Sequence, residues 1–152
     1  KALANGEVTR AHYARYLVQI GKVSNDGQAF KRYLGSGKSC FVKAEWVSIP
    51  TAIDTIHAAG GVAVIAHPMR YNMTGKWIRR LIVDFKQWGG DSMEVADSGQ
   101  TKDQRQYLAR LANEYDLAAS LGSDFHFPCG WIELGKNLFL PEEVNPIWTL
   151  FE

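Results

Sequence analysis

Cysteine is scarce in this chain of 152 residues, which has only Cys40 and Cys129 and no CxxC pair. Neither a disulfide framework nor a cysteine-based zinc site is expected, and both thiols are predicted to be reduced. The sequence also lacks any apolar run near the roughly 18 residues that a membrane span needs. Hydrophobic residues still make up 46% of the chain, enough for a packed core. We therefore expect a soluble, cytoplasmic protein with no membrane partner.

Net charge is small, at +1, but it is unevenly distributed along the chain. Residues 1–50 hold eight Lys or Arg against three Asp or Glu, whereas residues 51–152 hold nine against thirteen. A basic front part favours a phosphate-bearing partner, and an acidic rear part favours cations. Solvated helix faces would give the same counts, so both interpretations stay open.

The first third of the sequence predicts a pair of short helices. Residues 9–20 and 25–34 place apolar side chains at helical spacing, with Gly21 and Gly35 as stops. Their tyrosines and Phe30 are expected to form the core of a small cap over residues 1–47. The chain begins at Lys1 without an initiator Met and enters almost directly into this helical pattern. We therefore expect it to be part of a longer protein.

From residue 48 onward helices and strands alternate. The pattern predicts helices over 48–60, 74–87 and 101–115 and strands over 62–66, 92–95 and 117–121. Ile53, Ile56, Trp77 and Ile78 are among the residues expected to face inward. Strands separated by helices imply a parallel sheet with right-handed crossovers, so residues 48–152 are predicted to form an α/β domain. Three strands are few for such a sheet, which suggests that further strands precede them.

Polar residues follow two of the predicted strands directly. His67 comes after the apolar run 62–66, and Asp124 and His126 come after 117–121. Functional groups of parallel sheets lie where the strands end at their carboxyl edge. Imidazole and carboxylate groups suit Zn²⁺, Mn²⁺ or Fe²⁺. A single histidine after a strand is more often structural, and an Asp-x-His can be a capping motif, but their joint occurrence favours a metal site.

Two segments resemble the last two metal-binding motifs of the PHP (polymerase and histidinol phosphatase) family. They are GVAVIAHPMRY over residues 61–71 and GSDFH over residues 122–126. The segment TRAHYARYLV, residues 9–18, resembles the helical insertion of the stand-alone branch called TrpH-like. The resemblance extends over essentially the whole chain. It implies the C-terminal part of a distorted (β/α)7 barrel, with a small helical insertion domain and two or three metal ions at the carboxyl ends of its strands.

The resemblance also implies a function. Family members hydrolyse phosphoesters with divalent metal ions, and the stand-alone branch acts on nucleoside 3′,5′-bisphosphates and on short RNA from the 5′ end. Mn²⁺ is the metal that the resemblance favours, with Zn²⁺, Fe²⁺ and Mg²⁺ left open. By position, His67, Asp124 and His126 would be metal ligands, and the last two would be catalytic. Arg70 and Tyr71 would hold the substrate phosphate.

Other positions are assigned less directly. Arg10 and His12 of the insertion are expected to reach the same pocket. Glu94 ends a strand at the same edge and could orient a ligand or the substrate, a weaker candidate than Arg70. The opening His-x-His motif of the family and the ligands that follow it are absent, since no segment before residue 9 could hold them. His57 lies in a predicted helix, where a surface or core role is favoured over ligation.

Two further interpretations stay open, together with one expectation about partners. The basic helix pair could form a nucleic-acid-binding module, with phosphates contacted by Arg10, Arg15, Lys31 and Arg32. The chain could instead be a catalytically incomplete PHP-like domain. Because an incomplete barrel exposes a sheet edge, we expect either self-association or an N-terminal piece that completes the barrel.

Overall fold

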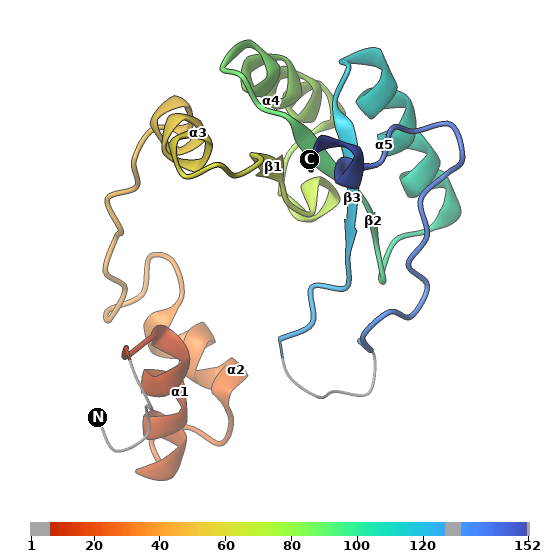
Figure 1. Cartoon of the computed structure of the whole chain (residues 1–152). Helices are drawn as coiled ribbons and strands as arrows, with labels where there is room; N and C mark the ends of the chain where they lie inside the picture. Colours follow the sequence, from red (N-terminus) through yellow and green to blue (C-terminus); the bar gives the residue numbers. More distant parts are fainter. Residues whose placement is uncertain (1–6, 127–131, 152) are drawn as a thin grey trace. The chain divides into compact units, whose positions relative to one another are not determined.

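The computed structural model describes residues 7–126 and 132–151 of the chain. It divides into two compact units, Lys1–Trp46 and Val47–Glu152, which are coloured from red to orange and from yellow to blue in Figure 1. Cys40 is a free, exposed thiol, whereas Cys129 lies outside the described residues. No helix in the described part of the chain is both long and apolar enough to cross a membrane.

The first unit consists of short helices. The α-helices α1 (Arg10–Gln19) and α2 (Asp26–Ala29) are followed by the π-helix η1 (Phe30–Leu34). Asn25 starts α2, because its side chain accepts a hydrogen bond from the Gln28 backbone N–H at 2.9 Å. After α1, the chain turns at Gly21, whose φ of +71° is readily adopted by glycine. The predicted helix pair is thus present, with its second member partly wound as a π-helix.

The core of the helical unit differs from the predicted one. It consists of four small or medium side chains, Ala14, Val23, Ala29 and Leu34. Tyr13 and Tyr16 were expected in this core but are 55% and 51% exposed. Alanines at the contact between α1 and α2 allow the helices to approach closely, so there is no room for phenol rings between them. Phe30 and Tyr33 do pack against the cluster, although only partly buried.

The second unit has the predicted order of helices and strands. Its helices are α3 (Ile49–Ala58), α4 (Gly75–Gln87) and α5 (Lys102–Glu114), with short 3₁₀ turns η2 (Pro68–Arg70) and η3 (Ile147–Leu150). The strands β1 (Val64–Ile65), β2 (Ser92–Asp97) and β3 (Ala118–Gly122) form one parallel sheet in the order β1-β2-β3. The parallel α/β arrangement is therefore confirmed. β1 is shorter than predicted, and β2 runs two residues further.

Helix capping in this unit follows the sequence signals. Ser48 accepts a hydrogen bond from the Thr51 N–H at the start of α3, and Pro50 occupies its first turn. Thr101 and Gln104 form a reciprocal capping box at the start of α5, with hydrogen bonds of 3.0 and 3.2 Å. The capping box at Thr101 fixes where α5 begins, directly after the loop that leaves β2.

Apolar residues from the helices and strands form one core in this unit. Its most fully buried side chains include Ile53, Ile82, Met93, Val95, Leu108 and Leu111. The prediction that Trp77 and Ile56 face the core is wrong, because Trp77 is 64% exposed and Ile56 is 37% exposed. In α4 the buried stripe runs through Ile78, Ile82 and Phe85. Trp77 precedes Ile78 by one position, or about 100° around the helix, and so points away from the core.

The two edges of the sheet have different neighbours. Beside β3, the Ala119 N–H donates a hydrogen bond of 2.7 Å to the Asn145 carbonyl, and Ala119 also forms a bridge with Pro146. On the opposite edge, β1 pairs only with β2 within residues 7–126 and 132–151. Because all three strands are parallel, the residues that follow them lie at one common edge, the carboxyl edge.

Candidate functional site

Residues from all three strand ends lie at the carboxyl edge. His67 follows β1, Glu94 and Asp97 belong to β2, and Asp124 follows β3. The charges of His67, Asp97 and Asp124 all act on the Glu94 carboxyl group. The parallel sheet therefore brings together the two strand ends that the sequence singled out, with the acidic β2 between them.

The chain leaves β1 and β3 through residues in an unusual backbone conformation. His67 has φ 34° and ψ 55°, and Asp124 has φ 55°. Both values fall in the left-handed region, which costs a non-glycine residue of order 1 kcal/mol. Such strain is found more often at functional sites than elsewhere. The two positions therefore differ from ordinary ends of strands.

The buried face of His67 offers a free nitrogen. Its Nδ1 is buried and has no hydrogen-bond partner among the described atoms. The ring packs edge-to-face against Tyr71, with centroids 5.8 Å apart and planes at 80°. An unpaired buried nitrogen is destabilising unless a ligand or water satisfies it. Nδ1 is therefore a candidate donor atom for a bound group.

Glu94 lies on the middle strand, β2, near the carboxyl edge of the sheet. Its Oε2 accepts the His67 backbone N–H at 2.5 Å, while its Oε1 lies against Gly122, where an added Cβ would come within 2.6 Å. Only 8% of Glu94 is exposed, and this burial raises the pKa of its carboxyl group. The His67 N–H opposes the shift, and the negative charges of Asp97 and Asp124 add to it.

Arg70 links two carboxylates. Its Nη1 donates to Asp124 Oδ2, and its Nη2 lies 3.4 Å from Asp97 Oδ1. The side chain of Asp97 is only 4% exposed, so this carboxylate is shielded from water. Arg70 is therefore already engaged. A phosphate at Arg70, or a metal ion at Asp124, would compete with the ion pair between them.

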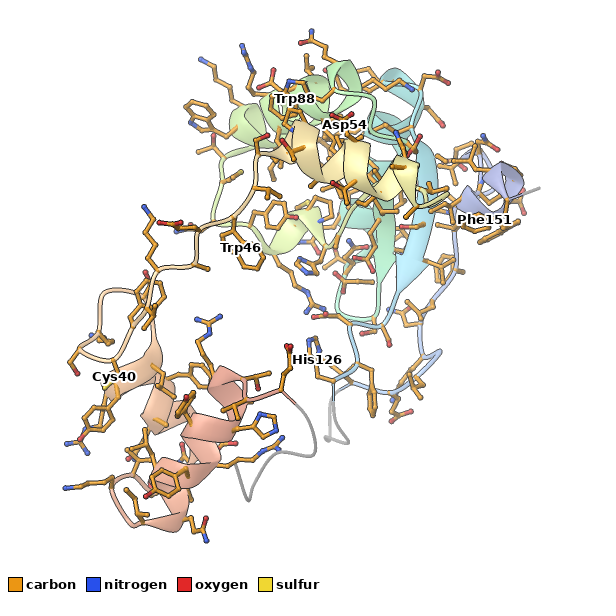
Figure 2. The ribbon with its side chains drawn as sticks, turned by 60° about the vertical axis from the view of Figure 1, so that its left-hand side comes forward. Cys40, Trp46, Asp54, Trp88, His126 and Phe151 are labelled. Atoms are coloured by element: carbon orange, nitrogen blue, oxygen red, sulfur yellow. The ribbon has the colours of Figure 1, made fainter. Side chains whose placement is uncertain are left out.

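His126 is the most accessible of the predicted ligands. Its side chain is 71% exposed and projects from the segment after β3 (Figure 2). Its Nδ1 lies 2.8 Å from the Asp124 backbone carbonyl, which can only accept a hydrogen bond. Nδ1 therefore carries the proton in the neutral ring, and Nε2 keeps a lone pair that could bind a metal ion.

Tyr71 is held in place by the segment that directly follows β1. Its hydroxyl donates a hydrogen bond of 2.8 Å to the Ala66 carbonyl. Burial raises the pKa of Tyr71, and the nearby Glu94 charge raises it further. The phenol thus stays protonated. Holding a phosphate, as predicted, would require its hydroxyl to leave Ala66.

The two predicted residues of the helical unit lie at the start of α1. Arg10 is its first residue and is exposed. His12 Nδ1 accepts the Thr9 backbone N–H at 3.0 Å and lies 2.8 Å from Thr9 Oγ1. His12 therefore contributes to capping α1. A role of either residue in substrate binding remains a prediction.

The donor atoms at the carboxyl edge suit a divalent metal ion in their chemistry. They include the unpaired Nδ1 of His67, the Nε2 of His126 and the carboxylates of Glu94 and Asp124. Within the described residues, however, no three such side chains lie close enough together to hold a metal ion. These residues thus supply suitable ligands without completing a site by themselves.

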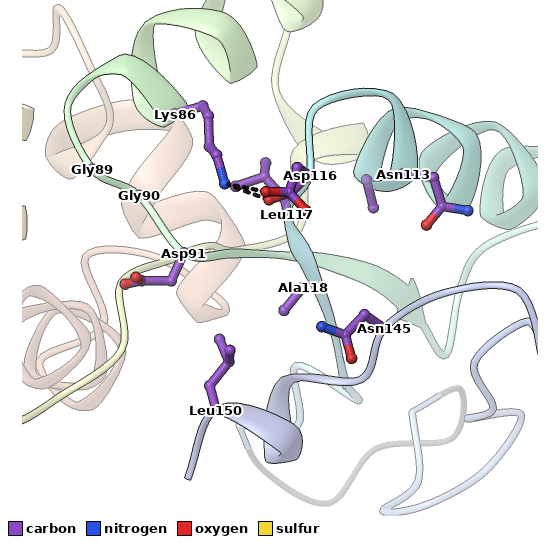
Figure 3. A pocket seen from close by; sticks show the side chains of 11 residues that line it. Lys86, Gly89, Gly90, Asp91, Asn113, Asp116, Leu117, Ala118, Asn145 and Leu150 are labelled. Carbon is purple, nitrogen blue, oxygen red and sulfur yellow. Dashed lines mark hydrogen bonds and ion pairs between the residues drawn. The ribbon is translucent and has the colours of Figure 1, made fainter.

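A pocket of about 400 Å³ adjoins Arg70 at this edge. It is lined by Met69, Arg70, Asp97, Ser98, Gly99, Gln100, Gln104 and Ile132. A second pocket, of about 410 Å³, includes Asp91 and Ala118 near the starts of β2 and β3 (Figure 3). His57, for which the sequence favoured a surface or core role, donates a hydrogen bond of 2.7 Å from its Nε2 to Asp91 Oδ2. It therefore lies near the amino ends of the strands, away from the candidate site.

Sequence reasoning missed two residues of the site. Asp97 and Gln100 were not singled out, although Asp97 ends β2 and pairs with Arg70. The signal was present in the position of Asp97, at the carboxyl end of the middle strand. It was overlooked because the strand was predicted to end at residue 95.

The raised pKa of Glu94 predicts a pH-dependent stability. Between its ordinary value of 4.5 and its raised folded value, the unfolded chain loses its proton first. The Glu94 contribution therefore destabilises the folded protein as pH rises through this window. We expect Glu94→Gln to raise the free energy of unfolding at pH 7 and to have little effect below pH 4.5. Urea unfolding with a chelator present measures this.

The exposed Asp54 on α3 provides a control. Asp54→Asn should change the free energy of unfolding by no more than about 0.5 kcal/mol. A Glu94→Gln protein that is less stable than the parent at pH 7 would show that the carboxylate stabilises the folded state.

No protein-family model matches this chain. Individual proteins, however, match it over nearly its whole length. The chain is 80% identical over 151 residues to a 5′-3′ exoribonuclease of Haemophilus influenzae, covering 99% of this chain and 55% of that protein. It is 42% identical over 146 residues to a 3′,5′-nucleoside bisphosphate phosphatase of Chromobacterium violaceum, covering 95% and 51%. The chain thus spans about half the length of the curated relatives it matches.

Two solved structures are similar to the model. One is an amidohydrolase of Chromobacterium violaceum with bound sulfate and no metal, with a TM-score of 0.78 and 41% identity over 94% of this chain and 50% of that one. The other, from Bifidobacterium adolescentis, is proposed to be a metal-dependent phosphoesterase, with a TM-score of 0.67 and 28% identity over 91% and 50%. Together with the parallel sheet, these likenesses indicate that the chain has a mixed α/β fold of the metal-dependent phosphoesterase and amidohydrolase type.

Proposed function

We propose that this chain is part of a metal-dependent phosphoesterase that hydrolyses nucleotide phosphoesters. Its substrates would be nucleoside 3′,5′-bisphosphates, short RNA attacked from the 5′ end, or both. The observation that carries the proposal is the carboxyl edge itself, where His67 has an unpaired Nδ1 and donates its backbone N–H to Glu94, and where the charge of Asp124 acts on the Glu94 carboxyl group. The names of the exoribonuclease and phosphatase relatives support it.

His67, Asp124 and His126 would bind the metal ion or ions, and Mn²⁺ is the favoured metal. A divalent ion would supply a Lewis acid that activates water and neutralises charge on the phosphoryl oxygens. His126 is suited to binding by its Nε2, because its Nδ1–H is directed to the Asp124 carbonyl. Glu94 would fix the position of His67 through the backbone N–H.

Arg70 would bind the substrate phosphate with its planar guanidinium group. In the free protein this group is kept in place by Asp97 and Asp124. When phosphate arrives, Arg70 would exchange Asp124 for phosphate oxygens and leave that carboxylate free for the metal. Substrate and metal binding would then favour each other, since each needs the same ion pair to open.

Activity should depend on metal and on the residues after β3. We expect the longest protein that the gene encodes to release phosphate from adenosine 3′,5′-bisphosphate with Mn²⁺, and to lose the activity on chelation. Asp124→Ala with His126→Ala should lower kcat/KM by at least about a hundredfold, since both proposed metal ligands after β3 are lost. Colorimetric phosphate release provides the measurement.

His57→Ala is the matched control, because His57 pairs with Asp91 away from the carboxyl edge. It should retain nearly full activity per folded molecule. Hydrolysis that survives both chelation and the double substitution would contradict the mechanism. Metal binding without any hydrolysis in the longest protein would favour the catalytically incomplete domain instead.

A second candidate function is nucleic-acid binding by the helical unit. Lys31, Arg32 and Lys38 line a shallow cleft of about 590 Å³ with Gln28. The two residues from η1 meet Lys38 because the chain turns at Gly35, whose carbonyl accepts the Lys38 N–H at 3.1 Å. No ion pair is formed by these three cations within the described residues. Unpaired cations in one cleft suit an RNA phosphate backbone.

This candidate predicts salt-dependent RNA binding. Changing Lys31, Arg32 and Lys38 together to alanine should weaken binding of a short single-stranded RNA, because the phosphates lose their counter-charges. Each lost contact should reduce the slope of log affinity against log salt by roughly 0.7. Fluorescence anisotropy in chelator follows binding without hydrolysis.

Three alanine changes at the exposed Lys22, Lys43 and Arg110 give the same change in charge outside the cleft. If this control weakens RNA binding as much as the cleft substitutions do, net charge rather than the cleft accounts for it.

The open edge of β1 suggests how the chain associates. An apolar groove of about 440 Å³ there is lined by Ile49, Val64, Ile65, Ala66, Tyr71, Met73, Leu81 and Phe85. Unpaired backbone groups beside apolar side chains favour addition of another strand. We propose that a strand from elsewhere in a longer protein covers this groove, and that in its absence a second copy does.

The isolated chain should therefore form dimers or larger species at micromolar concentrations. Val64→Lys, at a residue 37% exposed on the edge strand, should shift it toward monomer, because a charge at the edge opposes strand addition. Light scattering measures the mass, and Val42→Lys is the control at a residue 83% exposed in the helical unit. A parent chain that stays monomeric at high concentration would contradict this proposal.

A further inference from the structure

The loop after β2 holds a buried hydrogen-bond donor that the proposed hydrolysis does not use. Gln100 is 7% exposed and lines the pocket of about 400 Å³ beside Arg70. Its side-chain Oε1 accepts the Asp97 backbone N–H at 3.1 Å, and its own N–H donates to the Asp97 carbonyl at 3.3 Å. These two bonds fix the side chain against the end of β2.

The remaining amide group of Gln100 has no partner. A backbone N–H can only donate, so the atom that meets Asp97 is the amide oxygen, and the atom left over is the NH₂ group. This Nε2 is buried and unpaired within the described structure. An unsatisfied buried donor is destabilising, so a ligand that supplies an acceptor would be favoured there.

The charge of the pocket argues against a phosphate as that ligand. Arg70 is its one cationic side chain among the described residues, and it is paired with Asp97 and Asp124. Asp97 also forms part of the lining, so a phosphate at Gln100 would meet a nearby carboxylate. An uncharged group with hydrogen-bond acceptors fits better.

Size and lining indicate which uncharged group this is. Small-molecule pockets span about 300 to 1,000 Å³ and combine apolar surface with a few polar groups. Here the thioether of Met69 provides polarizable surface, and Gln100 and Gln104 provide amides. A nucleobase has both a flat apolar face and ring acceptors at its edge.

We infer that this pocket is a nucleobase subsite, in which Gln100 Nε2 donates to an acceptor on the base of a nucleotide whose phosphate is bound by Arg70. The inference rests on the proposed function, because it takes the phosphate at Arg70 to belong to a nucleotide. Every base carries a ring nitrogen or carbonyl that can accept, so a single donor would hold a base without selecting one. This suits a subsite that must accept successive nucleotides of RNA.

Nuclear magnetic resonance on the longest protein that the gene encodes can observe this donor directly. The side-chain NH₂ signals of Gln100, assigned by their loss in Gln100→Glu, should shift on titration with adenosine 3′,5′-bisphosphate in chelator. Inorganic phosphate at equal concentration should leave them in place. If inorganic phosphate moves them equally, or if the nucleotide binds without moving them, the nucleobase subsite is wrong.

Two matched variants test the donor by affinity. Gln100→Glu keeps an oxygen for the Asp97 N–H but removes the donor, and should weaken nucleotide binding about tenfold or more. Gln104→Glu adds the same charge to the same pocket and can keep the capping box of α5, so it should weaken binding less than about threefold. Equal losses in both variants would assign the effect to charge and overturn the inference.

The two proposals fail in different ways. Inorganic phosphate that binds normally while Gln100 does not respond to nucleotide would overturn the subsite alone. If neither the nucleotide nor inorganic phosphate binds to the longest protein, the phosphoesterase proposal fails and the subsite fails with it.

Discussion

The buried carboxylate of Glu94 is the constraint on which the carboxyl edge depends. It joins the end of β1 to the middle of the sheet through the His67 N–H, and it lies against Gly122 of β3, where any larger residue would collide with it. A carboxylate in this position is costly, because burial and two neighbouring acids both disfavour its charge. A protein shaped only for stability would place an apolar residue there. In the proposed function, a metal ion bound at this edge would supply the positive charge that offsets this cost.

Arg70 compensates for part of this negative charge in the free protein. It contacts Asp97 and Asp124 but remains 37% exposed, so it can be reached from solvent. The pair keeps the acidic residues compatible with folding and leaves the arginine available to an anion. In the proposed function, Arg70 and Asp124 would neutralise each other until phosphate and metal bind.

Much of the fold could be predicted from the sequence, and the failures have identifiable causes. The parallel sheet, the helix order and the caps at Ser48 and Thr101 follow from local patterns that tertiary packing did not override. Tyr13 and Trp77 were misplaced because apolar character was taken for burial, whereas large rings are often half exposed. For the candidate site, the strand-end rule located His67 and Asp124. It could not give the left-handed backbone of either residue or the unpaired amide of Gln100. It also could not give the bridge from Arg70 to two carboxylates, because that bridge joins segments far apart in the sequence.

Buried polar side-chain atoms without hydrogen-bond partners occur at few places in the described part of the chain. Among the described residues, the buried side-chain atoms without partners are His67 Nδ1, Gln100 Nε2 and Arg105 Nε. The first belongs to a residue at the carboxyl edge, and the second belongs to a residue that lines the pocket beside Arg70. Arg105, in α5, uses another of its nitrogens to contact the Asn137 carbonyl at 2.9 Å and stacks over Phe139 at 3.9 Å, so its position is already fixed. Native proteins leave few such groups. Gln100 and Arg105 both contact the backbone of Asp97, whose carboxylate pairs with Arg70. In the proposed function, a bound metal ion would pair with His67 Nδ1 and a nucleobase would pair with Gln100 Nε2.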